Sequence, residues 1–133
     1  MIIRKAKITD SLVLSLLMNE SFGWEMTKPS SPLFFSNKNI TCLVAENDDG
    51  ELMGSASLHL LQKINRRMGI IEDVAVFEKF RGKKIGVNLI NELIKLSKNQ
   101  DCYKVILNTK LDNLSYYEKL GFVSKELQME LRL

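Results

Sequence analysis

The stretch Val74–Gly86, VAVFEKFRGKKIG, joins the apolar end of a strand to a short basic loop with two glycines and the start of a helix. Apolar residues on one helix face follow it, at Leu89, Ile90, Leu93 and Ile94. The run Tyr103–Leu107 then has the apolar, β-branched character of a buried strand. Crossovers of this kind are right-handed and leave their two strands parallel. We therefore expect the helix to begin at the carboxyl edge of the sheet, where ligands of open α/β sheets bind.

The loop Arg81–Gly86, RGKKIG, has two interpretations. The backbone N–H groups of a first helical turn and the helix dipole favour an anion, and glycines let a phosphate approach the main chain closely. Alternatively, the loop is a solvated basic turn, as most basic turns are. The hexapeptide alone does not decide between them, so the flanking sequence has to.

The chain before this crossover predicts an antiparallel meander. A first strand is expected at Ile2–Ile8. Ile40–Glu46 and Glu51–Leu60 form a predicted hairpin, because the turn Asn47–Gly50 supplies residues that tolerate positive φ angles. Arg67–Val76 is the third antiparallel strand of the meander. The fold class is thus α/β, with a central twisted mixed sheet, an antiparallel N-terminal meander, a β-α-β crossover and flanking helices.

Further helices are predicted on either side of the meander and crossover. Thr9-Asp10 offers an N-cap for a helix with an apolar stripe at Leu12, Val13, Leu16 and Leu17. Trp24–Asn39 contains both prolines and reads as a loop, with room for a short helix. Asp112 or Asn113 caps a short helix through Tyr117, which Gly121 stops, and Phe122–Leu131 supplies a last strand.

Composition limits the class of protein. A chain of 133 residues that is 45% apolar fits one domain, residues 1–133. The formal charge of +3 is too small to argue for nucleic-acid binding, and the tight basic clusters are Arg66-Arg67 and Arg81–Lys84. Cys42 and Cys102 read as reduced, buried thiols, and with the lone His59, read as structural, they have no metal-ligand spacing. We expect a cytoplasmic protein without a signal peptide, membrane span or metal.

From Gly69 onward the sequence resembles the GNAT superfamily of acetyl-CoA-dependent N-acetyltransferases. In that superfamily a Val-x-Val-like strand end precedes a pyrophosphate loop of Arg or Gln, two residues, Gly, one residue, and Gly or Ala. Here Val74-Ala-Val76 precedes Arg81–Gly86, and Lys84 stands at the middle glycine. A nearer resemblance is to glucosamine-6-phosphate N-acetyltransferases, carried in register by Ile71–Val76, Cys102–Leu107, Tyr116–Phe122 and Met129–Arg132. Those enzymes have a longer N-terminal helical region than this chain.

The resemblance implies roles for named residues. The acetyl-CoA contacts would be Val74, Ala75, Val76, Arg81, Gly82, Lys83, Lys84, Ile85, Gly86, Asn113, Tyr117 and Lys119. The acceptor side would be formed by Glu72, Asp73, Asn108 and Arg132, and the catalytic residues would be Tyr117, Asp73 and Asn108. Asn108 stands where the amino-sugar enzymes have an aspartate near the attacking amine. Arg132 matches a sugar-phosphate contact that crosses a dimer interface in those enzymes.

Some of these residues have plainer interpretations. Adjacent carboxylates on a strand point to opposite faces, so at least one of Glu72 and Asp73 is a surface charge, and we favour Asp73 for the site. Tyr117 matches the tyrosine beside the thioester sulfur and would protonate the leaving thiolate, although composition alone also allows an ordinary core tyrosine. Its neighbour Tyr116 is expected to tolerate replacement by phenylalanine. A terminal arginine such as Arg132 is otherwise usually solvated.

The resemblance therefore implies direct acetyl transfer from acetyl-CoA to a primary amine, such as an amino sugar phosphate like glucosamine 6-phosphate, and a homodimer. One alternative is a related acetyltransferase for another small amine or a peptide N-terminus. The other is a non-catalytic acyl-CoA-binding module that kept the loop and lost the chemistry.

Overall fold

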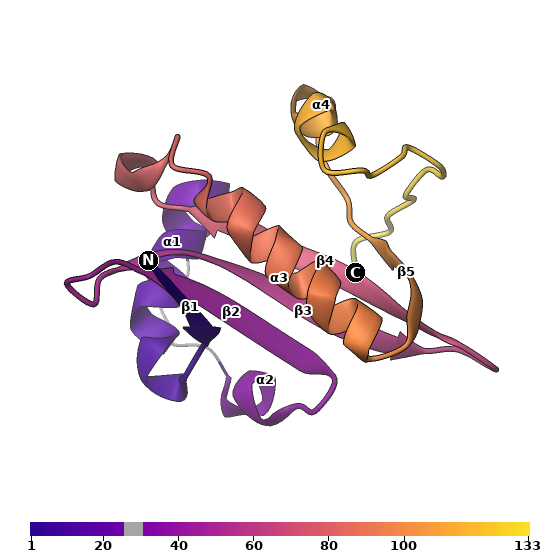
Figure 1. The fold of residues 1–133 in the computed structure, drawn as a ribbon, viewed down its shortest axis with the longest axis horizontal. Coiled ribbons are helices and arrows are strands. Elements are labelled where there is room, and N and C mark those ends of the chain that lie inside the picture. Colours follow the sequence, from indigo (N-terminus) through magenta and orange to yellow (C-terminus); the bar gives the residue numbers. More distant parts are fainter. Residues whose placement is uncertain (26–30) are drawn as a thin grey trace.

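The computed structural model describes residues 1–25 and 31–133, and its strands form one five-stranded sheet in the order β1-β2-β3-β4-β5 (Figure 1). The strands are β1 (Ile2–Lys5), β2 (Ile40–Glu46), β3 (Leu52–Gln62), β4 (Arg67–Val76) and β5 (Cys102–Ile106). Strands β1 to β4 pair antiparallel, and β5 runs parallel to β4. The predicted mixed sheet, with its meander and its crossover, is confirmed.

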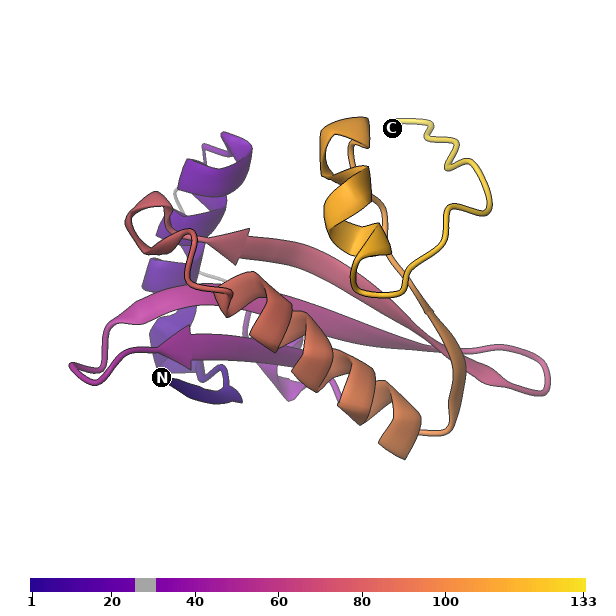
Figure 2. The same cartoon turned by 45° about the horizontal axis from the view of Figure 1, so that its top comes forward.

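Helices lie on both faces of this sheet. They are α1 (Ser11–Phe22), α2 (Pro32–Ser36), α3 (Ile85–Asn99) and α4 (Leu114–Glu118), with short 3-10 turns at Ile8–Asp10, Glu78–Phe80 and Leu111–Asn113. Helix α3 crosses one face and α1 lies behind the other (Figures 1 and 2). Helix α2 confirms the short helix in the predicted loop, and residues 26–30 of that loop lie outside the described residues.

Two apolar cores sandwich the sheet. The core under α3 contains Leu43, Ala45, Met53, Ala56, Leu58, Ile71, Phe80, Ile85, Leu89, Ile90 and Leu93. The core under α1 contains Leu14, Leu17, Met18, Cys42, Val44, Leu52 and Ala75. Because successive residues of a strand point to opposite faces, neighbours such as Leu43 and Val44 serve different cores. The predicted α3 stripe is correct, with Leu89, Ile90 and Leu93 fully buried.

The predicted apolar stripe of α1 is wrong at three of its four positions. Leu12 and Leu16 are 66% and 61% exposed and Val13 is also exposed, whereas Leu14, Leu17 and Met18 face the sheet. The helix carries apolar residues on several sides, so periodicity did not select the buried one. Serines share the buried face, and Ser15 Oγ satisfies itself by donating to the Ser11 carbonyl oxygen at 3.0 Å.

The N-terminal strand is shorter than predicted, because the chain turns after Lys5. Asp10 is the N-cap residue of α1, as expected, but its side chain makes no capping hydrogen bond. Its carboxylate instead accepts from the Lys7 backbone N–H at 2.7 Å and from the Arg4 guanidinium at 2.8 and 3.0 Å. The guanidinium of Arg4 lowers the pKa of that carboxyl. This network ties β1 to the start of α1.

The predicted last strand is also wrong. Residues 122–131 form no strand in the structure and run outside the sheet, at the yellow end of the chain in Figures 1 and 2. Their alternating apolar side chains are exposed, at Val123, Leu127, Met129 and Leu131. Alternation suits a strand, but a strand also needs a partner, which this segment does not contact here. Cys102 is partly exposed rather than buried as predicted, whereas Cys42 is buried, and both are free thiols.

Candidate active site

The second half of β4 has an open edge. Strand β5 pairs only with the first half of β4. The paired residues are Arg67 with Cys102, Gly69 with Val105, and Ile70 with Ile106. Beyond the last pair, at Ile106, the chain leaves the sheet toward α4, as both views show (Figures 1 and 2). From Ile71 to Val76, therefore, the described strands leave β4 with only β3 as a neighbour. An open strand edge can bind an extended molecule through main-chain hydrogen bonds.

A β-bulge distorts β4 in this open half. Ser55 pairs with Ala75 and Ser57 with Glu72, so two residues of β4 oppose the single Ala56 of β3. Within the bulge Asp73 has φ +53°, a left-handed conformation that residues other than glycine rarely adopt. A bulge of this kind re-aims side chains and is common beside active sites.

The bulge places Asp73 near a residue for which the sequence suggested only a structural role. Although Asp73 is exposed overall, partial desolvation of its carboxylate raises its pKa above the ordinary value, and the charge of His59 lowers it by less. The His59 ring lies on β3, 6.4 Å from the ring of Phe34 in α2. Sequence spacing could not reveal this neighbourhood, because His59 comes near Asp73 only through the pairing of β3 with β4, in which His59 lies opposite Ile70.

The predicted pyrophosphate loop connects β4 to α3. Phe80 is buried and anchors the preceding 3-10 turn, and Arg81 Nε donates to the Val76 carbonyl oxygen at 3.3 Å. Gly82 has φ +83° and Lys84, the N-cap residue of α3, has φ +59°. Lys84 occupies the position where the family pattern has glycine. The left-handed backbone explains that glycine, since a residue with a Cβ atom pays roughly 1–2 kcal/mol there.

The start of α3 presents donors without acceptors. The Asn88 N–H makes the helix's first bond, to the Lys84 carbonyl oxygen at 3.0 Å, so the earlier N–H groups have no partner within the helix. Among the described residues, Arg81, Lys83 and Lys84 form no ion pair with a carboxylate. Free N–H groups, a positive helix end and unpaired cations together favour an anion at this place.

Helix α4 brings two tyrosines close to the start of α3, where the Tyr116 hydroxyl lies beside Gly86. The rings of Tyr116 and Tyr117 pack edge to face at 5.0 Å, and Tyr117 also packs edge to face on Phe122 at 6.0 Å. Tyr117 is partly buried against the core under α3. Desolvation raises the pKa of both hydroxyls, and Tyr116 raises that of Tyr117 further. Both therefore stay protonated, and able to donate, at neutral pH.

The remaining predicted site residues lie around these segments. Asn108 is exposed, two residues beyond the end of β5. Asn113 is the N-cap residue of α4 and Lys119 follows the helix, both exposed. The structure does not bring Arg132 to the others. It lies in the exposed C-terminal segment, and its Nε donates to Glu130 Oε1 at 2.6 Å.

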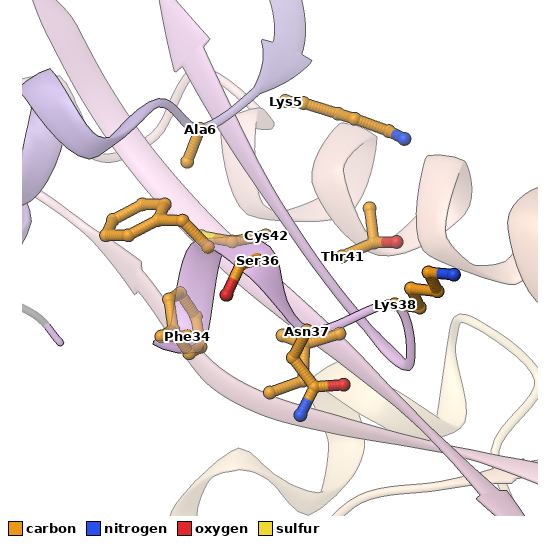
Figure 3. A pocket seen from close by; sticks show the side chains of 10 residues that line it. Lys5, Ala6, Phe34, Ser36, Asn37, Lys38, Thr41 and Cys42 are labelled. Atoms are coloured by element: carbon orange, nitrogen blue, oxygen red, sulfur yellow. The ribbon is translucent and has the colours of Figure 1, made fainter. Parts of the chain in front are cut away.

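A cavity of about 240 Å³ lies elsewhere, between the end of β1, α2 and the start of β2 (Figure 3). Its lining comprises Lys5, Ala6, Phe34, Phe35, Ser36, Asn37, Lys38, Ile40, Thr41 and Cys42. No predicted site residue is among them. We place the candidate site at β4 because the open edge, the bulge, the loop and the tyrosines converge there, and an open binding edge need not be an enclosed cavity.

Residues 1–25 and 31–133 contain neither a membrane-spanning helix nor a metal-binding group. No helix in these ranges is long and apolar enough to cross a membrane. Nor do they contain a group of three His, Cys, Asp or Glu side chains that could hold a metal ion.

The family model of the acetyltransferase (GNAT) family matches residues 12–122. Glucosamine 6-phosphate N-acetyltransferases are similar in sequence: that of Trypanosoma brucei brucei is 41% identical over 97 residues and that of Arabidopsis thaliana 34% identical over 98. Each alignment covers 71% of this chain and 66% of the relative, so the chain spans about two thirds of the length of these relatives.

Solved structures agree with these matches. A crystal structure of a Trypanosoma brucei acetyltransferase has a TM-score of 0.85 at 34% identity and covers 99% of both chains. The glucosamine-6-phosphate N-acetyltransferase of Arabidopsis thaliana has a TM-score of 0.81 at 27% identity and covers 98% of this chain and 97% of its own. Sequence and fold therefore lead to one conclusion: the chain belongs to the GNAT family of acetyltransferases.

Proposed function

We propose that the chain transfers an acetyl group directly from acetyl-CoA to a primary amine. The observation that carries this proposal is the open half of β4, which leads into a loop and a helix start rich in free donors. The pantetheine arm would pair with the edge at Val74–Val76, and the pyrophosphate would bind at Arg81–Gly86. Asn113 and Lys119 would contact the cofactor from α4.

The proposed chemistry needs no covalent enzyme intermediate. The neutral amine nitrogen attacks the thioester carbonyl carbon, and the main chain near Val74 stabilises the negative oxygen that forms. When that intermediate collapses, the C–S bond breaks and Tyr117 gives its proton to the departing thiolate, later regaining one from solvent. Asp73 takes the proton that the amine loses, a role that its raised pKa supports. The products are an amide and free coenzyme A thiol.

Glucosamine 6-phosphate is the proposed acceptor, and the names of the relatives at 41% and 34% identity support it. On the acceptor side Asn108 would accept a hydrogen bond from the amine, in place of the aspartate of the amino-sugar enzymes. Arg132 would hold the acceptor phosphate, supplied by a second copy of the chain in a homodimer, and the enzyme would work in the cytoplasm. Glu72 would line the same side.

One assay tests the proposal. Release of free thiol from acetyl-CoA is followed with a panel of amines, glucosamine 6-phosphate first, then glucosamine, amino acids, polyamines and a peptide N-terminus. Release with glucosamine 6-phosphate above all others supports the proposed acceptor, and release only with another amine replaces it. Acetyl-CoA binding by calorimetry without release for any amine would instead make the chain a binding module.

The acceptor phosphate has its own test. Arg132→Ala should raise the Michaelis constant for glucosamine 6-phosphate by about 10-fold or more, since a charge-assisted contact contributes roughly 1.5–3 kcal/mol. Lys125→Ala on the same exposed segment is the matched control and should leave that constant unchanged. An equal change for glucosamine, which has no phosphate, would remove Arg132 from the acceptor site.

A further inference from the structure

The hydroxyl of Tyr116 lies against the first turn of α3. A Cβ atom built on Gly86 would be 2.9 Å from that oxygen, so the phenol of α4 reaches back to the start of α3, which precedes β5 in the chain. Tyr116 has no part in the proposed chemistry, and its sequence position alone suggested that phenylalanine would serve equally well. Its place in the structure suggests a further role for the hydroxyl, which remains to be tested.

Packing directs the Tyr116 side chain to this place. Its ring stands edge to face on Tyr117 at 5.0 Å, while the residue remains 38% exposed and accessible to a ligand. Within the described part of the chain its hydroxyl has no hydrogen-bond partner. An oriented hydroxyl with no partner among the described residues is available to a bound molecule.

The start of α3, which this hydroxyl approaches at Gly86, carries donors. The first-turn N–H groups of α3 have no acceptor within the helix. The cations of the loop that leads into this turn form no ion pair among the described residues. The Tyr116 hydroxyl also stays protonated at neutral pH, because desolvation raises its pKa. A protonated hydroxyl beside free helix N–H groups and a basic loop fits an acceptor-rich anion and disfavours a cation.

We infer that Tyr116 donates a hydrogen bond to a pyrophosphate oxygen of acetyl-CoA and so holds α4 against the start of α3. This inference rests on the proposed function. Binding of the pyrophosphate would then also fix Tyr117, because the two rings pack on each other. Tyr116 is thus a cofactor-binding and positioning residue that lies on α4, outside the pyrophosphate loop.

Tyr116→Phe removes only the hydroxyl, and two acetyl donors separate its roles. We expect kcat/KM with acetyl-CoA to fall about 10-fold, and the calorimetric Kd for coenzyme A to rise by a similar factor, as for loss of a hydrogen bond to a charged group. With S-acetylpantetheine, which lacks the pyrophosphate, kcat/KM should stay unchanged. Tyr103→Phe is the matched control, because that exposed tyrosine lies on β5 and bonds to Lys63 instead. It should leave both donors unaffected.

A second variant tests the contact itself. The Cβ atom of Gly86→Ala would meet the Tyr116 hydroxyl, the movable end of a side chain, so the variant should fold and displace that oxygen. Gly86→Ala should therefore weaken acetyl-CoA binding in the parent and have a clearly smaller effect when Tyr116→Phe is already present. Strictly additive effects in this cycle would contradict the inference.

The remaining outcomes are also decisive. Unchanged or tighter acetyl-CoA binding by folded Tyr116→Phe overturns the inference while leaving the proposed function intact. Equal losses with acetyl-CoA and S-acetylpantetheine assign Tyr116 a purely structural role and overturn it as well. If the parent chain neither binds nor consumes acetyl-CoA, the proposed function fails, and the inference fails with it.

Discussion

The two halves of β4 have the same neighbour on one edge and different surroundings on the other. Arg67–Ile70 pairs with both β3 and β5, and Gly69 in this half packs closely under α3, next to Leu58 and Ser97. Ile71–Val76 pairs only with β3, contains the bulge and holds Asp73 at φ +53°. One strand thus combines a closed half that belongs to the core with an open half that borders the candidate site.

The comparison shows that the destabilising features of this sheet are concentrated in the open half of β4. An open strand edge with free main-chain groups can pair with another chain and cause aggregation. A left-handed aspartate costs roughly 1–3 kcal/mol of stability. Both features occur within six residues of one strand and continue into a loop with a second left-handed residue, Lys84. Strain and unsatisfied groups that cluster in this way are expected where a ligand binds.

The largest expected effect tests whether the open half serves catalysis as well as binding. Tyr117→Phe keeps the packing of the ring but removes the proposed proton donor for the thiolate. Turnover under saturating substrates should fall roughly 10²- to 10⁴-fold, the usual contribution of general acid catalysis. Acetyl-CoA affinity by calorimetry and thermal stability should change little. Activity within about twofold of the parent would return Tyr117 to the role of a core tyrosine.

The next effect compares one glycine beside each half of β4: Gly54 of β3, which lies opposite Val76 in the open half, and Gly69 in the closed half. In Gly54→Ala the new Cβ atom would lie 2.7 Å from the Ala75 carbonyl oxygen, which belongs to the backbone of the open half. Because backbone cannot move aside as a side chain can, we expect a loss of about 1–3 kcal/mol in the free energy of unfolding. The displaced strand end should also weaken acetyl-CoA binding. Denaturant unfolding and calorimetry measure the two effects.

Gly69→Ala is the counterpart in the closed half. Its Cβ atom would lie 2.8 Å from Leu58 Cδ1 and 3.1 Å from Ser97 Oγ, both side-chain atoms that can shift. We expect a smaller destabilisation, about 1 kcal/mol, and no change in acetyl-CoA affinity at temperatures where the variant is folded. The division of β4 is wrong if Gly69→Ala weakens acetyl-CoA binding as much as Gly54→Ala does.

The closed half and the α3 crossover were predictable from sequence because they follow local rules. A strong apolar stripe at Leu89, Ile90 and Leu93 determines which face of α3 is buried. The apolar, β-branched run after that helix identifies a strand, and the crossover helix leaves it parallel to β4. The predicted burial of this strand is wrong, because β5 has no buried residue and Tyr103 and Ile106 are 41% and 37% exposed. The turn around Gly50, with φ +78°, similarly determined the β2–β3 hairpin.

The open half and the C-terminal region could not be predicted in the same way. Glycine in a strand indicates a left-handed bulge, but aspartate does not, so the sequence indicated an ordinary strand residue at Asp73. Residues 122–131 alternate like a strand, but alternation does not say whether a partner strand is available. The contact between Tyr116 and Gly86, and the approach of His59 to Asp73, depend on how distant segments pack. No local pattern contains that information.

A smaller effect concerns the backbone strain at Lys84, in the loop that follows the open half of β4. Lys84→Gly removes the Cβ atom from a left-handed N-cap position with φ +59° and should raise the free energy of unfolding by up to about 1 kcal/mol. Lys84→Ala is the matched control: it also removes the charge but keeps the Cβ atom, so it should not stabilise the protein. Thermal melts of the three proteins measure the difference. Equal stabilisation by both variants would mean that the lysine charge, not the backbone strain, is responsible.

The smallest expected effect is a pH dependence at Asp73. Partial desolvation raises the folded-state pKa of this carboxyl above its unfolded value of about 3.9, so the folded protein binds that proton more tightly than the unfolded chain does. The charged form therefore destabilises the fold above the raised pKa, and this cost disappears as the pH falls below the unfolded value. Asp73→Asn should stabilise the protein at neutral pH, and its advantage over the parent should shrink as the pH falls toward about 3. Asparagine also tolerates left-handed backbone well, which adds a gain that does not depend on pH, so the change in the difference between the two proteins is the quantity to measure. Because the carboxyl is exposed, solvent screening keeps this change small. An advantage that stays constant across the pH range would show that the backbone, and not the charge of Asp73, is what the open half of β4 strains.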